Sequence, residues 1–345
     1  MLRNPRNSYQ SIFSSRRRIF DGACRRGMTG GGMHSVAATQ NEAASTMDQL
    51  KTTCVFSTIA DFRRERRALP RESSVGFVPT MGALHDGHLD LFRRARAECD
   101  VVVGSVFVNP AQFAPHEDLD QYPRQLERDL ELLGAEGLVD LVFAPTRSEM
   151  YTSAHRTYVD PKGFDDLPEG VARPGFFKGV ATVVAKLLNV VQPDRAYFGQ
   201  KDALQCVLIN RLVEDLNIPV EVVIEETRRE ADGLAMSSRN AYMSKVERAA
   251  APAVYLALQA AADARTRAAK AGRPASRREL VGAAEAILSE QPLVTSVDYL
   301  SVGCPSTMEE LDEVGKAGAV VSVAVRLGAV RLIDNVVLPP ASEFC

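Results

Sequence analysis

Two of the five histidines, His85 and His88, lie three residues apart, directly after the apolar run 75–78 and before the amphipathic run 89–97. This order predicts a strand, a glycine turn and the start of a helix, with both imidazoles on one side of the first helical turn. A helix start offers unpaired N–H groups and the positive end of the helix dipole, which favour anions. Two added imidazoles suit a triphosphate whose negative charge shifts as a bond breaks. The alternative is an ordinary strand-to-helix turn that carries histidine.

The amides of Asn109 and Gln112 directly follow a second apolar run, 101–108. At the end of a buried strand, such amides can hydrogen-bond the hydroxyls or the carboxylate of a small polar substrate. An Asn-Pro turn followed by a solvated glutamine explains the same residues. This segment alone therefore leaves both interpretations open.

A third polar segment contains Lys201, Asp202 and Gln205, and it follows the apolar run 196–198. A lysine suits a phosphate oxygen, whereas Asp202 suits ribose hydroxyls or the cap of the following helix. Gln205 lies one helical turn beyond Lys201, on the same side. A Lys-Asp pair at a helix start is common, so this motif is weak by itself.

The fourth segment, 232–240, joins two parts of different composition and contains Ser237, Ser238 and Arg239. Two hydroxyls and a guanidinium in a flexible loop can close over a triphosphate and follow its charge into the transition state. A linker that only caps the next helix is the alternative. All four segments follow a predicted strand or a domain junction, so a doubly wound sheet would bring them to one crevice.

The elements that must position these residues alternate between strand and helix. Several strand candidates are continuous runs of Val, Ile and Leu, as in a parallel sheet that is covered on both faces. The predicted strands are 75–78, 101–108, 141–143, 196–198 and 220–224, and the predicted helices are 88–98, 124–134, 178–191 and 202–216. This alternation predicts an α/β fold with a doubly wound, Rossmann-like parallel sheet.

Beyond residue 227 the pattern changes, and we expect a smaller C-terminal α+β domain. An Ala-rich run predicts a long helix, and Gly272 and Pro274 separate it from a second helix. The predicted helices are 245–271 and 276–289, and the predicted strands are 297–302, 319–326 and 330–337, with a turn at 327–328. The expected domains are 47–227, which would hold the nucleotide and the substrate, and 228–345, which would act as a lid.

Residues 1–46 differ from the rest of the chain, because seven arginines against two acidic residues give them a net charge of +5. They contain no long apolar segment, so they do not resemble a secretory signal. Three interpretations remain: a disordered arm, a mitochondrial transit peptide, or sequence upstream of a start at Met47. The expected location is cytoplasmic, or mitochondrial if these residues act as a transit peptide.

Composition excludes several classes of protein. The net charge of −3 and the pI near 6.0 argue against a general nucleic-acid or membrane-surface binder. No apolar run approaches the roughly 20 residues that span a bilayer. The six cysteines show no C-x-x-C spacing, which argues against a zinc site and is typical of reduced thiols in an intracellular protein. No P-loop and no G-x-S-x-G motif is present.

Five blocks together resemble the pantothenate synthetase (pantoate–β-alanine ligase) family over roughly residues 50–340. In order they read VPTMGALHDGH, FVNPAQF, DQYPRQLERDL, RPGFFKGVATVVAKLLNVVQPDRAYFGQKD and READGLAMSSRN. The family belongs to a nucleotidyltransferase superfamily that shares an H-x-G-H element with class I aminoacyl-tRNA synthetases. The resemblance implies that ATP and (R)-pantoate form a pantoyl adenylate and pyrophosphate. The amine of β-alanine then gives pantothenate and AMP.

The family's residue roles carry over to the matching positions. His88, His85, Lys201 and Arg239 would be catalytic, with Mg²⁺ required, and Asp129 is a candidate for the metal region. Pantoate would be held by Gln112 and Gln205, and β-alanine would face Gln112 and Asn109. The ATP site would comprise Met81, Gly82, Ala83, Leu84, His85, Asp86, Gly87, His88, Gly199, Gln200, Lys201, Asp202, Arg228, Met236, Ser237, Ser238 and Arg239. The family also implies a homodimer.

The chain departs from the family at three positions. Phe176 and Lys178 stand where the family usually has His and Arg, and Arg228 replaces a usual Val beside the adenine. These changes bear on substrate affinity more than on the type of reaction. Two competing functions are a nucleotidyltransferase that releases an adenylated product, which should lack the paired glutamines, and a non-catalytic nucleotide-binding protein. The latter should have lost His85, His88, Lys201 or Arg239.

Overall fold

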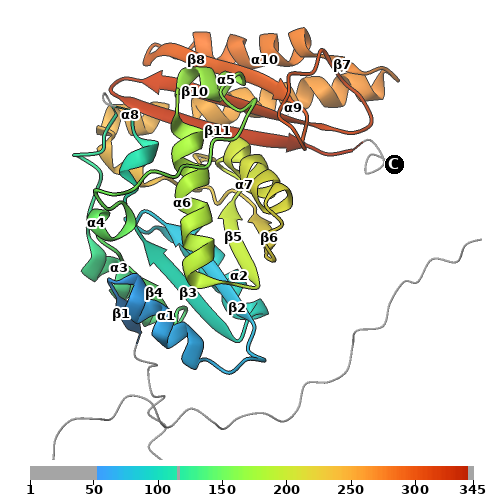
Figure 1. Ribbon diagram of the computed structural model, residues 1–345. Helices are drawn as coiled ribbons and strands as arrows, with labels where there is room; N and C mark the ends of the chain where they lie inside the picture. Colours follow the sequence, from blue (N-terminus) through green and yellow to red (C-terminus); the bar gives the residue numbers. More distant parts are fainter. Residues whose placement is uncertain (1–52, 115–116, 341–345) are drawn as a thin grey trace, which may run out of the picture. The chain divides into compact units, whose positions relative to one another are not determined.

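The computed structural model describes residues 53–114 and 117–340, and the predicted N-terminal extension lies outside them. Strands β1 to β6 of the first part are Cys54–Phe56, Val75–Thr80, Val101–Val106, Leu141–Phe143, Arg195–Gly199 and Glu221–Glu225. They form one parallel sheet in the order β1-β4-β3-β2-β5-β6 (Figure 1). This arrangement confirms the predicted doubly wound sheet.

Helices cover both faces of this sheet. Helices α1 to α7 are Ile59–Ala68, Asp86–Glu98, Leu126–Ala135, Arg147–Met150, Pro168–Ala172, Phe176–Val191 and Ala203–Asp215. Neighbouring strand residues point to opposite faces, and both faces are buried: Phe77 packs with α1, α6 and α7, whereas Val78 packs with α2 and α3. Burial on both sides explains why the strands read as continuous apolar runs.

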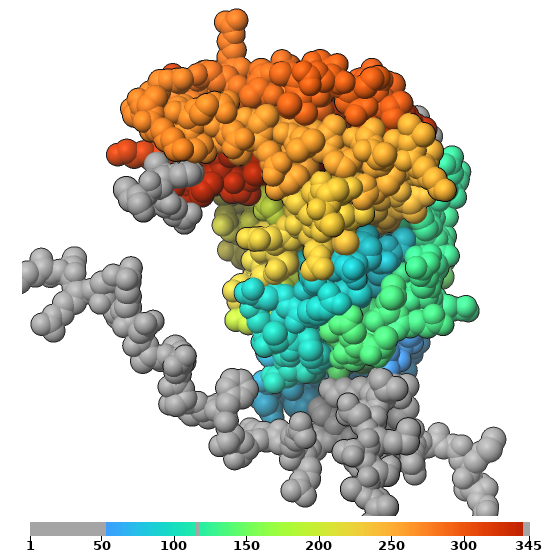
Figure 2. Space-filling view, turned by 180° about the vertical axis from the view of Figure 1, so that it is seen from behind, coloured from blue at the N-terminus to red at the C-terminus, as the bar shows by residue number. Residues whose placement is uncertain are grey.

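An antiparallel sheet covered by helices forms the main part of the C-terminal layer. Strands β8, β10 and β11 are Val294–Gly303, Ala319–Leu327 and Val330–Leu338, and they pair antiparallel in the order β11-β10-β8. Helices α9, Ala253–Lys270, and α10, Arg277–Ser289, bury one face of this sheet. In Figure 2 the orange α9 and α10 form a continuous outer surface, and red residues of the last strands emerge beneath them.

The structure corrects the predicted single helix over 245–271. Helix α8, Lys245–Ala250, ends before Pro252, and α9 begins at Ala253. Proline has no N–H to donate to the carbonyl four residues earlier, and its ring clashes there, so the helix is interrupted. Helices α1, α4 and α5 were not among the predicted elements. Neither were β1, the pair β7 (Ala275–Ser276) and β9 (Glu313–Val314), or the 3₁₀ turns η1 (Pro110–Gln112) and η2 (Ser238–Tyr242).

The described residues belong to a single compact unit, so the division between residues 227 and 228 stays a prediction. Strand β3 ends two residues before the predicted end, because the chain turns into η1 at Pro110. None of the helices in the described part of the chain has the length and apolar character needed to cross a membrane.

Close packing of α6 against η1 yields a stability prediction. A Cβ at Gly179 would lie 2.1 Å from the carbonyl oxygen of Ala111, so Gly179→Ala must push the helix away from the turn. We expect the free energy of unfolding, measured by urea titration, to fall by about 1–3 kcal/mol. The matched control is Gly282→Ala in α10, where no atom lies within 4 Å. It should raise stability by about 0.5–1 kcal/mol. Equal effects of the two substitutions would contradict the packing argument.

Candidate active site

A cavity of about 740 Å³ opens at the carboxyl ends of β2 and β5. The strand order reverses between these two strands, since β3 and β4 follow on one side of β2 and β6 follows on the other side of β5. Adjacent loops diverge at such a switch point and leave a crevice for ligands. Segments after β2, β3 and β5, the segment 226–240 and strand β11 all line the cavity. The four polar segments singled out in the sequence therefore meet in one place.

The turn between β2 and α2 is held by a buried carboxylate. Gly82 and Ala83 both adopt left-handed backbone, with φ of 83° and 53°. The oxygens of Asp129 accept hydrogen bonds from the backbone N–H groups of Ala83 at 2.9 Å and Leu84 at 2.8 Å. Asp129 is fully buried. The strained turn is thus fixed by a residue of α3 that lies more than forty positions away in sequence.

His85 and His88 lie together at the start of α2. His85 is the N-cap residue, and the two ring centroids are 4.0 Å apart. The Nδ1 atom of His88 accepts from the backbone N–H of His85 at 3.4 Å. A neutral His88 with this bond carries its proton on Nε2, which makes Nε2–H a hydrogen-bond donor.

Both imidazoles are held in the neutral form. Burial, together with the positive charge of Lys201, lowers the pKa of His85 from 6.5 to about 4. Burial, followed by the charges of His85 and Lys201, lowers the pKa of His88 well below 6.5. At neutral pH, the rings therefore serve as donors and acceptors of hydrogen bonds, and the positive charge of the cavity comes from other residues.

Lys201 and Asp202 follow β5 and face each other, with Lys201 Nζ 3.2 Å from Asp202 Oδ1. The loop that carries them rests on β11, because Asn335 Nδ2 donates to the carbonyls of Gln200 and Lys201, both at 2.9 Å. Gln200 itself is turned toward Asn335. Lys201 thereby reaches the cavity from a loop that both sheets support.

One end of the cavity is lined by amides. Asn109 is buried, and its side chain donates to Gln112 Oε1 at 2.9 Å and to the carbonyl of Gly179 at 3.1 Å. Its Oδ1 accepts from Tyr151 at 2.8 Å. Asn109 is therefore fully engaged and holds Gln112 in place, while Gln112 and Gln205 both line the cavity.

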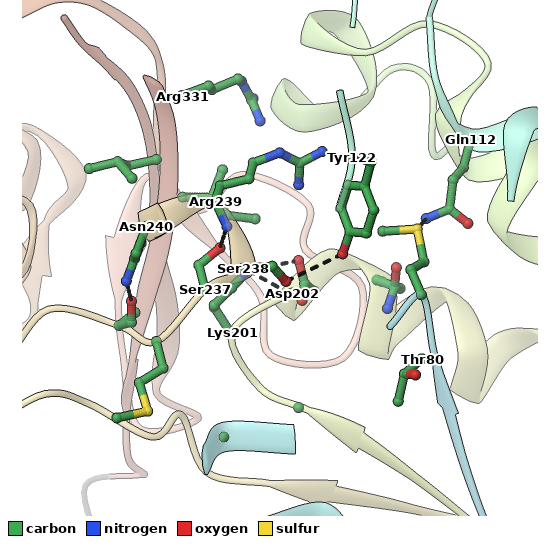
Figure 3. Close-up of a pocket in the computed structure, with 18 of the residues that line it drawn as sticks. Thr80, Gln112, Tyr122, Lys201, Asp202, Ser237, Ser238, Arg239, Asn240 and Arg331 are labelled. Carbon is green, nitrogen blue, oxygen red and sulfur yellow. Dashed lines mark hydrogen bonds and ion pairs between the residues drawn. The ribbon is translucent and has the colours of Figure 1, made fainter. Parts of the chain in front are cut away.

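The opposite end is lined by η2 and its neighbours. Arg239 forms a two-pronged ion pair with Asp118, at 2.9 and 2.8 Å. Figure 3 shows Tyr122 beside the Ser238 hydroxyl, from which its own hydroxyl lies 3.3 Å away. Ser237 accepts from the backbone N–H of Arg239 at 3.3 Å. A phosphate that approaches Arg239 thus meets a guanidinium that is already oriented by a carboxylate.

Some predicted site residues do not line the cavity. Most of the predicted ATP and substrate residues line the cavity directly. The exceptions form the turns that support it, and they are Gly82, Ala83, Leu84, Asp86 and Gln200. Asp129 does not line the cavity either, and its oxygens accept hydrogen bonds from backbone N–H groups, so its place in the metal region stays a prediction. Within residues 53–114 and 117–340, no group of three or more His, Cys, Asp or Glu is arranged to hold a metal ion.

Sequence reasoning also missed residues that line the cavity. Arg173 pairs with Glu117 at 2.8 Å and lies 3.5 Å over the ring of Phe176. Tyr122 and Asp118 flank Arg239, and Arg331 enters from β11. The sequence contained one indication of their role, namely that Tyr122 and Arg173 lie within the blocks that resemble the family. Of the three departures, Phe176 and Arg228 line the cavity, while Lys178 instead lies over Tyr158.

The lowered pKa of His85 predicts how stability depends on pH. Below pH 6.5 the unfolded chain takes up a proton that the folded chain accepts only near pH 4, so acid favours unfolding in this window. We expect His85→Gln to reduce the loss of unfolding free energy between pH 7 and pH 5 by on the order of 1 kcal/mol. Urea titrations of the variant and the wild type at both pH values measure this difference. Parallel pH profiles would contradict it.

The geometry of Asp129 predicts a structural effect. Asp129→Ala leaves two buried N–H groups without acceptors, which should lower the free energy of unfolding by about 2–5 kcal/mol. The matched control is Glu131→Ala, an exposed residue of the same helix, which should change stability by less than about 0.5 kcal/mol. If Asp129→Ala keeps wild-type stability and only raises the Mg²⁺ concentration needed for activity, the expected metal role stands instead.

Comparison with known proteins agrees with this geometry. The family model described as Pantoate-beta-alanine ligase matches residues 54–337. A pantothenate synthetase of Chloroflexus aggregans is 53% identical over 281 residues, which are 81% of this chain and 98% of that protein.

Solved structures of similar fold come from the same family. A pantothenate synthetase from Thermus thermophilus is 49% identical, with a TM-score of 0.76, over 83% of this chain and 100% of that one. A pantoate-beta-alanine ligase from Francisella tularensis, complexed with beta-gamma ATP and beta-alanine, is 32% identical, with a TM-score of 0.68, over 83% of this chain and 98% of that one. This chain belongs to the pantoate–β-alanine ligase family.

Proposed function

We propose that this protein joins (R)-pantoate to β-alanine at the expense of ATP, through an enzyme-bound pantoyl adenylate. The observation that carries the proposal is one cavity with two chemically different ends. Imidazoles, Lys201 and Arg239 suit the triphosphate, and the amides of Gln112 and Gln205 suit pantoate. The paired glutamines favour a ligase over a nucleotidyltransferase that releases its adenylate.

The first step brings two anions together. A carboxylate oxygen of pantoate forms a bond to the α-phosphorus, the bond from that phosphorus to the bridging oxygen breaks, and pyrophosphate leaves with the electron pair. Positioning and charge compensation should dominate such a step. Lys201 and Arg239 supply positive charge, and the neutral His88 offers Nε2–H as a donor to a phosphate oxygen.

In the second step, the uncharged amine of β-alanine attacks the carbonyl carbon of the adenylate. AMP leaves with the electron pair of the broken C–O bond, and the nitrogen loses a proton as the amide forms. Gln112 would lie beside both reacting groups, because Asn109 holds its amide at the pantoate end of the cavity. Asn109 would then act by fixing Gln112, since its own polar atoms are already bonded.

Mg²⁺ would enter with the triphosphate. The carboxylates of Asp118 and Asp202 line the cavity. Their oxygens suit a hard cation such as Mg²⁺, which binds few protein ligands and takes the rest from the phosphates and water. Asp202 is the freer of the two, with 42% of its side chain exposed, whereas Asp118 pairs with Arg239. When bound, the cation would neutralise charge on the phosphates.

Two further expectations stay proposals. One is a homodimer, which sedimentation of the purified chain would test. The other is a cytoplasmic location, or a mitochondrial one if residues 1–46 act as a transit peptide. Imaging of full-length and shortened chains would separate these locations.

The proposed function predicts an exchange reaction. Protein that begins at Met47 should catalyse exchange between ATP and labelled pyrophosphate when Mg²⁺ and pantoate are present, without β-alanine. AMP should be released once β-alanine is added. His88→Ala should lower the exchange rate by about 10²–10³-fold or more, because a preorganised donor to the reacting phosphate is lost.

The matched control is His155→Gln, since His155 lies between Tyr151 and Tyr158, outside the cavity lining. This control should keep the wild-type exchange rate. Tight ATP binding without pantoate-dependent exchange would point to another acid substrate. Wild-type exchange by a well-folded His88→Ala protein would reject the proposed site.

A further inference from the structure

The face of the C-terminal sheet that borders the cavity carries two arginines in directly opposed positions. Arg326 of β10 and Arg331 of β11 are register partners, and both line the cavity with Asp298 of β8. Like charges directly opposite each other on a sheet are destabilising. A sequence that retains such a pair beside a cavity needs a source of negative charge nearby.

Asp298 supplies only part of that charge. The strand register shifts where Asp298 falls, between the pairs Val325–Val297 and Ala324–Tyr299, and such a bulge re-aims a side chain. Its Oδ2 accepts from Arg331 Nε at 2.7 Å, and its Oδ1 lies 4.0 Å from Arg326 Nε. Asp298 therefore faces two guanidinium groups, and the buried Glu169 of α5 also interacts with Arg331 through its charge.

Arg331 also has an unused donor. Its Nη2 is buried and lacks a hydrogen-bond partner within the described residues, and only 19% of its side chain is exposed. A buried donor on a charged group is costly to leave unpaired. Because Nε is taken by Asp298, the remaining N–H groups suit an oxyanion such as a phosphate.

The position of Arg331 indicates which anion it would bind. Figure 3 shows Arg331 next to Arg239, with Gln112 on the opposite side of the view. The Gln112 end suits pantoate, so the anion at Arg331 is not the substrate carboxylate. It is the part of the triphosphate farthest from the reacting carboxylate.

We propose that Arg331 binds the terminal phosphates of ATP and the pyrophosphate that they become in the first step. The inference rests on the proposed function, because it assigns a residue to the leaving group of that reaction. When the bond between the α-phosphorus and the bridging oxygen breaks, the electron pair departs with pyrophosphate. Arg331 then faces the group on which negative charge increases, from a sheet separate from the one that carries the histidines.

The competing explanation is purely structural, namely that Arg331 only pairs with Asp298 across β10. The two explanations predict opposite results for the partner. If the ion pair is what matters, Arg331→Gln and Asp298→Asn should have the same effect. If Arg331 binds the leaving group, Asp298→Asn removes a competing negative charge and leaves pyrophosphate binding intact.

The test compares binding of inorganic pyrophosphate with Mg²⁺ by calorimetry, and the pyrophosphate concentration that half-saturates pantoate-dependent exchange. Arg331→Gln should raise both values by roughly tenfold to a hundredfold, as expected for loss of a hydrogen bond to a charged group. Half-saturation by pantoate should stay at its wild-type value. Arg331→Lys, which keeps the charge but loses the planar fork, should fall between wild type and Arg331→Gln.

Two further variants serve as references. Asp298→Asn should bind pyrophosphate as tightly as the wild type or more tightly. Arg273→Gln, which removes an exposed arginine paired with Glu279 outside the cavity, should match the wild type in every value. If Arg331→Gln does not fold, the comparison of Arg331→Lys with Asp298→Asn decides the question.

The proposal is overturned if Arg331→Gln and Asp298→Asn weaken pyrophosphate binding equally, or if neither arginine variant weakens it. Failure of the proposed function would look different. In that case the wild type would show no pantoate-dependent exchange, while calorimetry would still report whether pyrophosphate binding depends on Arg331.

Discussion

The buried carboxylate of Asp129 is the constraint on which the site depends. The chain must leave β2 and enter α2 within a few residues, and it does so through left-handed backbone at Gly82 and at Ala83, a residue with a Cβ. Such backbone costs free energy and persists only when its surroundings fix it. The two hydrogen bonds to Asp129 fix it from α3, and they thereby set where His85 and His88 lie.

The C-terminal sheet is part of the same site. Arg229 forms a two-pronged ion pair with Asp334, at 2.6 and 3.0 Å, and also donates to the carbonyl of Asn335. Asn335 in turn donates to the carbonyls of Gln200 and Lys201. Strand β11 therefore braces both the loop after β5 and the segment that leads to Arg239. A lid movement of this layer, as the sequence analysis expects, would have to carry or release these contacts.

Features that depend on residues close together in sequence could be predicted, whereas features that depend on residues far apart in sequence could not. Strands such as 141–143 were predicted with the right bounds, because burial on both faces leaves a local apolar signal. The histidine turn was also foreseen from local spacing. The positions of Asp129, Arg173 and Arg331 were not, because each depends on partners that only the folded chain brings near. The break at Pro252 was a local signal that the Ala-rich composition obscured.

Burial, and after it nearby positive charge, keeps the two histidines neutral. The burial and the nearby Lys201 that lower their pKa values leave the positive charge of the cavity on lysine and arginine side chains. Arg239 and Arg331 are each paired with a carboxylate, Asp118 and Asp298. A triphosphate therefore meets cations that are already partly balanced. A site built this way can compensate charge during the reaction without holding pyrophosphate so tightly that its release becomes slow.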